Sequence, residues 1–166
     1  LLRGSELKPS HSKVFYQFYL STIYKMGAIP YLKPEFFEKV FRSMSDEVLL
    51  FLAEVEGTPI AASLCYQKGN SLYGRYWGAT KEVRNLHFEL CYYRPIEWAI
   101  ANKLERFEAG AQGEHKMARG FVPELTYSAH WIQHPAFREA VAQFIGEEKL
   151  AIKNLFAGWG EHSPYL

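Results

Sequence analysis

The chain has 166 residues, which is the length of one domain, and a net charge of +1. Hydrophobic residues make up 48% and charged residues 22%, so the composition is that of a folded globular chain and not of a disordered one. A charge this close to neutral gives no overall attraction to nucleic acid or to an anionic membrane. Aromatic residues reach 16%, which favours a ring-rich core and a cleft lined with rings.

Two helices are predicted at the N-terminal end. Apolar residues recur at helical spacing in Val14–Met26, and Gly27 just past them is typical of a helix end. A second helix is expected to begin near Pro34, which suits a first helical turn, and to bury Phe37 and Phe41.

Three strands follow the helices. Val48–Val55 is a near-continuous apolar run, typical of a strand that is buried on both faces. Turn residues at 56–59 and at Gly69–Asn70 separate this run from Ile60–Gln67 and Ser71–Ala79. Short turns join antiparallel neighbours, so the three strands are predicted to form a meander.

Helical spacing then returns over residues 86–104, with a kink or restart expected at Pro95. The remaining expected elements are a strand at Arg106–Ala109, a helical turn at Glu114–Arg119, a strand at Thr126–Ile132, and a helix from His134 that buries Phe137, Val141, Phe144 and Ile145. The tail after Asn154 is expected to be irregular. This order indicates an α+β domain with a mixed sheet, and it excludes a doubly wound nucleotide fold, which needs regular strand–helix alternation.

The two cysteines, Cys65 and Cys91, have no spacing typical of a metal site. Cys65 lies in an apolar strand, which raises the pKa of a thiol and makes it inert. Two thiols without a disulfide framework favour a reducing compartment, and we predict a cytoplasmic location. No apolar run approaches the ~20 residues that span a bilayer, so no membrane segment is expected. The sequence does not begin with Met, and we expect a single domain over residues 1–166 that forms the C-terminal half of a longer protein.

Two stretches of the sequence resemble a known family. They are Leu72–Ala79 followed by Leu86–Tyr93, and Phe107–Phe121 followed by Thr126–Trp131. Both resemble the signature of the FemAB-like predicted N-acyltransferases, a bacterial family of peptidoglycan biosynthesis or recognition within the GNAT superfamily. The resemblance implies a predominantly antiparallel sheet flanked by helices, in which Ser71–Ala79 and Arg106–Ala109 splay apart to admit the acyl donor. The usual first strand of that fold is missing from this sequence.

The resemblance also implies an activity, the transfer of an acyl or aminoacyl group to an amine such as a cell-wall precursor. FemAB proteins take an amino acid from aminoacyl-tRNA, which makes tRNA an expected partner. Acetyl-CoA-dependent relatives hold a pyrophosphate on an Arg/Gln-x-x-Gly-x-Gly/Ala loop, which is absent after Ala79. The donor therefore stays open between acyl-CoA and aminoacyl-tRNA. The alternative is a non-catalytic recognition module that binds cell-wall fragments or anionic ligands in the same cleft.

Arg75 is the first candidate for contact with substrate. Strict alternation along a strand places it on one face with Tyr73 and Trp77, where a guanidinium can stack on a ring and bind a carboxylate or phosphate. A structural ion pair with a glutamate is the alternative. We predict that Arg75, Tyr76 and Trp77 bind substrate together.

His87 and Glu89 stand at the start of the helix after that strand. A helix N-terminus favours a neutral imidazole, which suits a general base for an attacking amine. The alternative is that His87 only caps the helix and Glu89 only complements its dipole. We place both residues in the predicted catalytic site.

Charged residues crowd the segment from Glu108 to Arg119, where glycines are interleaved with them. Glu108 and Glu114 are candidates for a carboxylate base, and Lys116 for the cation that stabilises the oxyanion of the tetrahedral stage. The remaining candidates for substrate binding are Gln112, His115, Arg119 and His130. A solvated charged surface is the alternative, and no metal is expected because further ligands at suitable spacing are lacking. We predict that the charged segment shares one cleft with His87.

Overall fold

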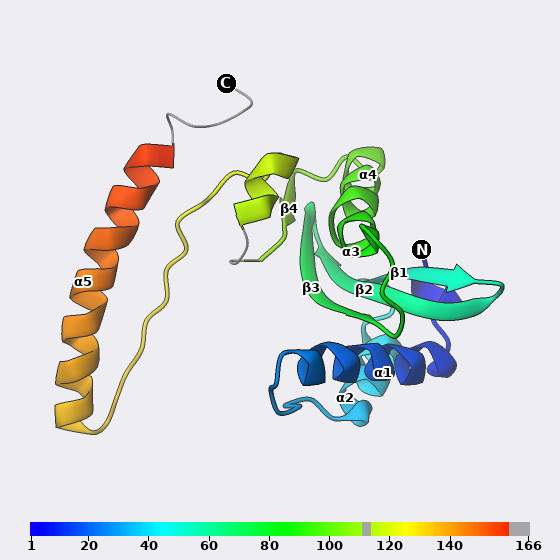
Figure 1. The fold of residues 1–166 in the computed structure, drawn as a ribbon, viewed down its shortest axis with the longest axis horizontal. Coiled ribbons are helices and arrows are strands. Elements are labelled where there is room, and N and C mark those ends of the chain that lie inside the picture. The colour runs from blue at the N-terminus through cyan, green and yellow to red at the C-terminus, as the bar shows by residue number, and fades with distance from the viewer. Residues whose placement is uncertain (111–113, 160–166) are drawn as a thin grey trace. The chain divides into compact units, whose positions relative to one another are not determined.

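The computed structural model describes residues 1–110 and 114–159 (Figure 1). The chain forms two compact units, Leu1–Gln112 and Gly113–Leu166. The single domain over residues 1–166 therefore stays a prediction. Within the described ranges, no helix is both long enough and apolar enough to cross a membrane. The cytoplasmic location also stays a prediction.

Two helices open the first unit, as predicted. Helix α1 spans Pro9–Lys25, so it begins before the predicted range of Val14–Met26, and helix α2 spans Pro34–Ser43. Each begins with a proline, whose fixed φ and missing N–H suit the first helical position. Gly27, at φ +65°, follows the end of α1 in the left-handed conformation that glycine adopts without strain.

The sheet contains the predicted meander. Strands β1 (Val48–Val55), β2 (Thr58–Lys68) and β3 (Ser71–Ala79) pair antiparallel in that order. Strand β4 (Arg106–Glu108) lies next to β3 and runs parallel to it, which confirms the expected neighbour. The sheet is therefore mixed, and the predicted fold class is confirmed.

A single bridge occupies the outer edge of β1. Leu2 and Leu50 exchange both backbone hydrogen bonds, at 2.9 and 3.0 Å, in an antiparallel bridge. The short 3-10 helix η1 (Gly4–Glu6) follows, with the Gly4 N–H bonded to the Ser45 carbonyl. The resemblance predicted that the usual first strand is missing, and in the described chain this bridge is all that pairs with β1 on that side.

The pairing of β2 with β3 contains a β-bulge. Leu64 lies opposite Tyr76, whereas its neighbour Cys65 lies opposite Gly74, so Arg75 is an extra residue in β3. A bulge of this kind interrupts the ladder and re-aims the side chain of the inserted residue.

The bulge changes which residues of β3 share a face. Leu72 and Trp77 pack in the same cluster, although strict alternation would separate them, while Tyr76 packs on the other side. Tyr73 lies opposite Tyr66, whose ring packs on the same side as Tyr76. The prediction that Tyr73 and Trp77 share a face is therefore wrong, because the extra residue breaks the alternation between them.

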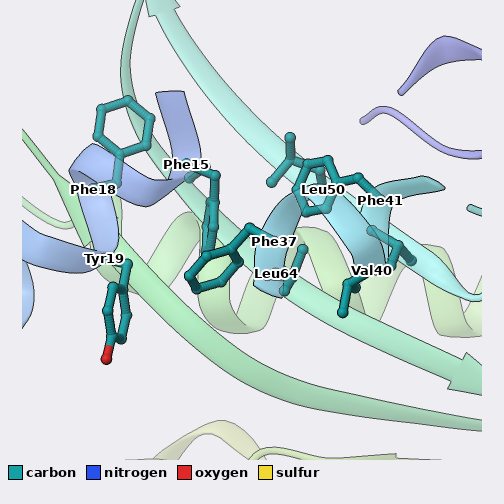
Figure 2. Packing of buried hydrophobic residues seen from close by; sticks show 10 residues of the cluster. Phe15, Phe18, Tyr19, Phe37, Val40, Phe41, Leu50 and Leu64 are labelled. Atoms are coloured by element: carbon teal, nitrogen blue, oxygen red, sulfur yellow. The ribbon is translucent and has the colours of Figure 1, made fainter. Parts of the chain in front are cut away.

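One face of the sheet is covered by α1 and α2, and Figure 1 shows α3 and α4 on the other side. Phe37, predicted to be buried, is fully enclosed at the centre of the first face, with its ring 5.4 Å from that of Phe15. Figure 2 shows this cluster, with Tyr19 at its edge and the Tyr19 hydroxyl directed away from the other rings. The buried members are Phe15, Phe18, Tyr19, Phe37, Val40, Phe41, Val48, Leu50, Ala62 and Leu64.

The helix on the other face is continuous from Leu86 to Ala101 but changes its winding. It consists of α3 (Leu86–Phe88), a π-helical segment (Glu89–Tyr93) and α4 (Arg94–Ala101). The predicted irregularity at Pro95 therefore appears as a π-helical segment just before the proline, and such segments are frequent at functional sites.

The sequence explains how the backbone hydrogen-bonding groups of this π-helical segment find partners. The Arg94 N–H bonds to the Glu89 carbonyl, five residues back, so the next bond in that pattern would join Pro95 to Leu90. Proline has no N–H, which leaves the Leu90 carbonyl without that partner. The hydroxyl of Ser63 in β2 donates to the Leu90 carbonyl and fixes the helix on the sheet.

The second unit differs from the prediction in two respects. It contains the 3-10 helix η3 (Glu114–Arg119), as expected, but residues 126–132 form no strand, because they have no strand partner within the described part of the chain. Helix α5 spans Pro135–Trp159 and so continues past Asn154, where an irregular tail was predicted. Phe137 and Phe144 are 60% and 62% exposed, so their predicted burial is also wrong.

Candidate functional site

Strands β3 and β4 are paired only at their beginnings. The paired positions are Ser71 with Arg106, Leu72 with Phe107 and Tyr73 with Glu108. Strand β4 then ends, while β3 continues to Ala79 without a further neighbour on that side among the described strands. From Gly74 onward the backbone of β3 therefore has no paired strand on that side in the described chain, although the Trp77 and Ala79 carbonyls accept hydroxyl groups from Thr22 and Ser21 of α1.

A pocket of about 140 Å³ lies where the two strands part. Four of the predicted site residues line it together, namely Arg75, Tyr76 and Trp77 from β3 and His87 from α3. The other lining residues are Ser63, Leu64, Cys65, Gly74, Cys91, Tyr92 and Ala109. The structure thus gathers residues from the bulge, the helix start and the end of β4 around one opening.

The imidazole of His87 lies among aromatic rings. Its centroid is 5.2 Å from that of Trp77 and 5.6 Å from that of Tyr92, and both contacts are edge-to-face. Phe88 adds a third edge-to-face contact at 5.5 Å. These rings hold the imidazole at the pocket wall by packing, which restricts its orientation.

A second pocket, of about 320 Å³, shares Trp77 and His87 with the first. It is lined by α1 and by the chain between β3 and α3, where the usual pyrophosphate loop was found to be absent. Lys25 and Glu82 stand at its rim 3.8 Å apart, and both side chains are largely exposed. The Trp77–His87 pair therefore forms the wall between two openings.

The guanidinium of Arg75 stacks on a neighbouring ring, with its central carbon 4.7 Å from the centroid of Tyr76. No carboxylate in the described ranges forms an ion pair with Arg75, so the alternative of a structural ion pair is not found. Stacking leaves the N–H groups at the edge of the guanidinium available for an anion.

Three further tyrosines lie near the Arg75–Tyr76 pair, and none of them was predicted as a site residue. Tyr19 and Tyr76 meet edge-to-face at 6.0 Å, and Tyr19 and Tyr31 do the same at 6.0 Å. The Tyr19 hydroxyl accepts the backbone N–H of Tyr31 at 3.2 Å, which fixes the α1–α2 connection beside the ring. The third of these tyrosines, Tyr66, lies in β2, and the charge of Arg75 acts on its phenol group. The high tyrosine content was the only sequence signal for this cluster, because its members come from distant elements.

The two carboxylates predicted to be catalytic in the first unit are both ion-paired. Glu89 accepts from Arg94 at 2.8 Å, and Glu108 lies 3.3 Å from the Nε of Arg106. Neither residue is among those that line the pocket at His87. Their catalytic roles stay predictions.

The other candidates lie in or beside the second unit. Lys116 and Arg119 are three residues apart on η3, and an Arg119 N–H donates to the His115 carbonyl at 2.6 Å. His130 is exposed, with a ring nitrogen 2.9 Å from the Ser128 hydroxyl. Gln112 lies outside the described residues, as does the side chain of Glu114. That these residues share a cleft with His87 stays a prediction.

The two cysteines are expected to differ in reactivity. Burial raises the pKa of Cys65 to about 12, and a hydrogen bond with Ser63 opposes the shift only in part. Because the thiolate is the nucleophile, Cys65 should resist iodoacetamide at mildly alkaline pH, whereas half-buried Cys91 should react. Peptide mass spectrometry after alkylation checks this, with a urea-unfolded sample as the control in which both cysteines react. Equal labelling of both residues in the folded protein would contradict it.

Comparison with known proteins shows the family of the chain. The model of the FemAB-like family, described as peptidoglycan biosynthesis/recognition, matches residues 1–166. The chain belongs to the FemAB-like family. No curated protein sequence matches the chain. Within the described residues, no group of three or more His, Cys, Asp or Glu side chains is arranged to hold a metal ion.

Two solved structures share the fold of this FemAB-like chain. One is the ribosomal-protein-alanine N-acetyltransferase from Brucella melitensis biovar Abortus 2308, at 10% identity and a TM-score of 0.50, covering 74% of this chain and 94% of that one. The other is described as "a possible acetyltransferase" from Clostridium difficile 630, at 12% identity and a TM-score of 0.50, covering 76% of this chain and 95% of that one. At these identities the likeness shows the GNAT fold alone.

Proposed function

We propose that this FemAB-like chain is an N-acyltransferase that transfers an acyl or aminoacyl group to an amine. The observation that supports this most is the parting of β3 from β4 beside a pocket that holds His87. An acyl donor with an extended, amide-containing arm can hydrogen-bond to the β3 backbone between Tyr73 and Trp77, where the strand has no paired neighbour on that side in the described chain. Its acyl group would then reach the pocket at the imidazole.

Within this proposal His87 is the general base. Among the described residues that line the pocket, His87 has the side-chain nitrogen that can accept a proton, since the guanidinium of Arg75 is already protonated. The ring contacts at Trp77 and Tyr92 fix the plane of the imidazole. The attacking amine must lose a proton as it bonds to the acyl carbon, and an imidazole accepts that proton near neutral pH. Lys116 is proposed to stabilise the oxyanion that the acyl carbonyl becomes.

A recognition module is the second candidate. It is favoured by one observation, that the carboxylates of Glu89 and Glu108 form ion pairs with arginines and do not line the pocket at His87. A module that only binds cell-wall fragments or other anionic ligands needs Arg75 and the aromatic rings, but it needs no base.

Transfer assays separate the two functions. Acyl-CoA thioesters and aminoacyl-tRNA should be tested as donors with an amine-bearing cell-wall precursor as acceptor, with product detected by mass spectrometry. We expect transfer with one donor class, and a fall in kcat of roughly 100-fold or more in Lys116→Met if Lys116 acts on the transition state. Lys153→Met, which removes an exposed lysine of α5, is the control. Ligand binding without turnover for every donor would support the recognition module instead.

A further inference from the structure

Cys91 lines the same pocket as His87 and belongs to the same continuous helix. The two residues are four positions apart, a spacing at which helical side chains are neighbours with Cβ atoms about 5–6 Å apart. The Cys91 side chain is half-buried, and its thiol is not part of a disulfide. The pocket therefore contains a nucleophilic sulfur beside a base.

The π-helical segment explains why Cys91 and Tyr92 both reach this pocket. In an α-helix successive side chains point about 100° apart, so the residues four and five positions after His87 would lie on different faces. The wider turn of a π-helix, with its i→i+5 bonds, brings the fifth residue round to the same side. Accordingly the Tyr92 ring lies 5.6 Å from the His87 ring, while Cys91 lines the pocket as well. The Ser63 hydroxyl, which donates to the Leu90 carbonyl, fixes the backbone just before Cys91.

Cys65 also lines the pocket, which gives an internal comparison between two thiols. Cys65 is almost fully buried in β2, and burial raises its pKa to about 12, so it stays protonated at neutral pH. Cys91 is less buried and is the helical neighbour of an imidazole that can accept its proton. Such an imidazole activates a cysteine as a nucleophile. The surroundings of Cys91 are those of a nucleophile, whereas the surroundings of Cys65 are those of a core residue.

The volume of the pocket, about 140 Å³, suits a small acyl group and not a whole donor, since drug-sized ligands occupy pockets of roughly 300 Å³ or more. We propose that Cys91 is a covalent nucleophile, which takes the acyl group from the donor as a thioester and then passes it to the amine. This role rests on the proposed transferase function and adds an intermediate to it.

The transfer then proceeds in two steps. In the first, the Cys91 sulfur attacks the carbonyl carbon of the donor, which is an ester or a thioester, and the thiol proton passes to His87. The bond from that carbon to the donor oxygen or sulfur breaks, and the leaving hydroxyl or thiol takes the proton from His87. In the second step the amine attacks the thioester carbon, the carbon–sulfur bond to Cys91 breaks, and His87 carries the amine proton to the departing sulfur. Charge and atoms balance in both steps, and neither step needs an oxidant or a reductant.

Intact-protein mass spectrometry of the reduced, full-length chain without any acceptor tests the proposal. The probe is S-acetyl-N-acetylcysteamine, a small thioester with an amide arm that requires no binding of CoA or tRNA. We expect the addition of one acetyl group, which neutral hydroxylamine removes as it does from a thioester, and peptide mapping should place it at Cys91. Acetylation should be roughly 100-fold slower in His87→Gln, which lacks the base. It should keep its rate in His11→Gln, which changes a histidine at the start of α1, outside the pocket lining.

Thermal unfolding shows whether each variant is folded, and urea-unfolded protein gives the rate at which the probe acetylates both cysteines without the pocket. No thioester at Cys91, equal labelling of Cys65 in the folded protein, or an unchanged rate in His87→Gln would each overturn the proposal. Wild-type transfer rates in Cys91→Ser and Cys91→Ala, in a protein shown to transfer acyl groups, would overturn it too, because the amine would then attack the donor directly. A His87-dependent thioester at Cys91 that no amine can discharge would support the nucleophile and reject the transferase function alone.

Discussion

Gly78→Ala should destabilise the first unit by about 3 kcal/mol or more, because the new methyl group has no space. A Cβ at Gly78 would lie 1.9 Å from the carbonyl oxygen of Phe18 and 2.2 Å from its carbonyl carbon. Both atoms belong to the backbone of α1, so no side-chain rotation can relieve the clash, and α1 must move away from β3.

Moving α1 would also break the bonds that hold it to the end of β3. The Ser21 hydroxyl donates to the Ala79 carbonyl and the Thr22 hydroxyl to the Trp77 carbonyl, each at 2.8 Å. Urea unfolding followed by circular dichroism measures the loss. Gly74→Ala is the matched control in the same strand, because its Cβ would meet neighbours only at ordinary distances of 3.5 Å and beyond. Similar stability of the two variants would show that α1 does not pack backbone to backbone on β3.

His87→Gln should lower kcat by roughly 10²- to 10⁴-fold in the transfer reaction, which is the usual contribution of a general base. Glutamine keeps a comparable size and hydrogen-bonding ability but cannot accept a proton near neutral pH. Substrate affinity should change little, because the ring contacts at Trp77 and Tyr92 position the side chain and not the substrate.

His11→Gln is the control for this substitution. The ring of His11 accepts the Lys8 backbone N–H at 3.0 Å at the start of α1, where a glutamine side chain can accept the same bond. Its kcat should equal that of the wild type. An unchanged kcat in His87→Gln, in a protein shown to transfer acyl groups, would remove His87 from the role of base.

Most of the first unit could be predicted from the sequence, because its signals are local. The proline at the start of α2 and the apolar run of β1 each depend on neighbouring residues only, whereas the start of α1 at Pro9 was not predicted. The placement of β4 beside β3 was also predicted, whereas its parallel direction was not. The bulge could not be predicted, because it depends on the register between two strands. The sequence of β3 alone is compatible with side chains that alternate regularly between the two faces of the sheet.

Only some of the residues of the candidate site could be predicted from the sequence. Arg75, Trp77 and His87 were found because each lies in or next to β3, and the structure gathers them in one pocket. Tyr31 and Tyr66 were missed because they reach the pair of Arg75 and Tyr76 from other elements. The predicted strand at residues 126–132 was wrong for the same general reason, since a strand is defined by a partner that local sequence cannot supply.

The bulge has a consequence for the length of β3. If residue 75 were absent, Gly74 would still lie opposite Cys65 and Tyr76 opposite Leu64, and simple alternation would keep Leu72 and Trp77 together on one face. The sheet therefore has no need of a residue at this position, and the chain carries one more amino acid than the pairing of its strands requires. A protein shortened by this single arginine should keep its neighbours in place, which separates what the strand needs for folding from what it offers to a ligand.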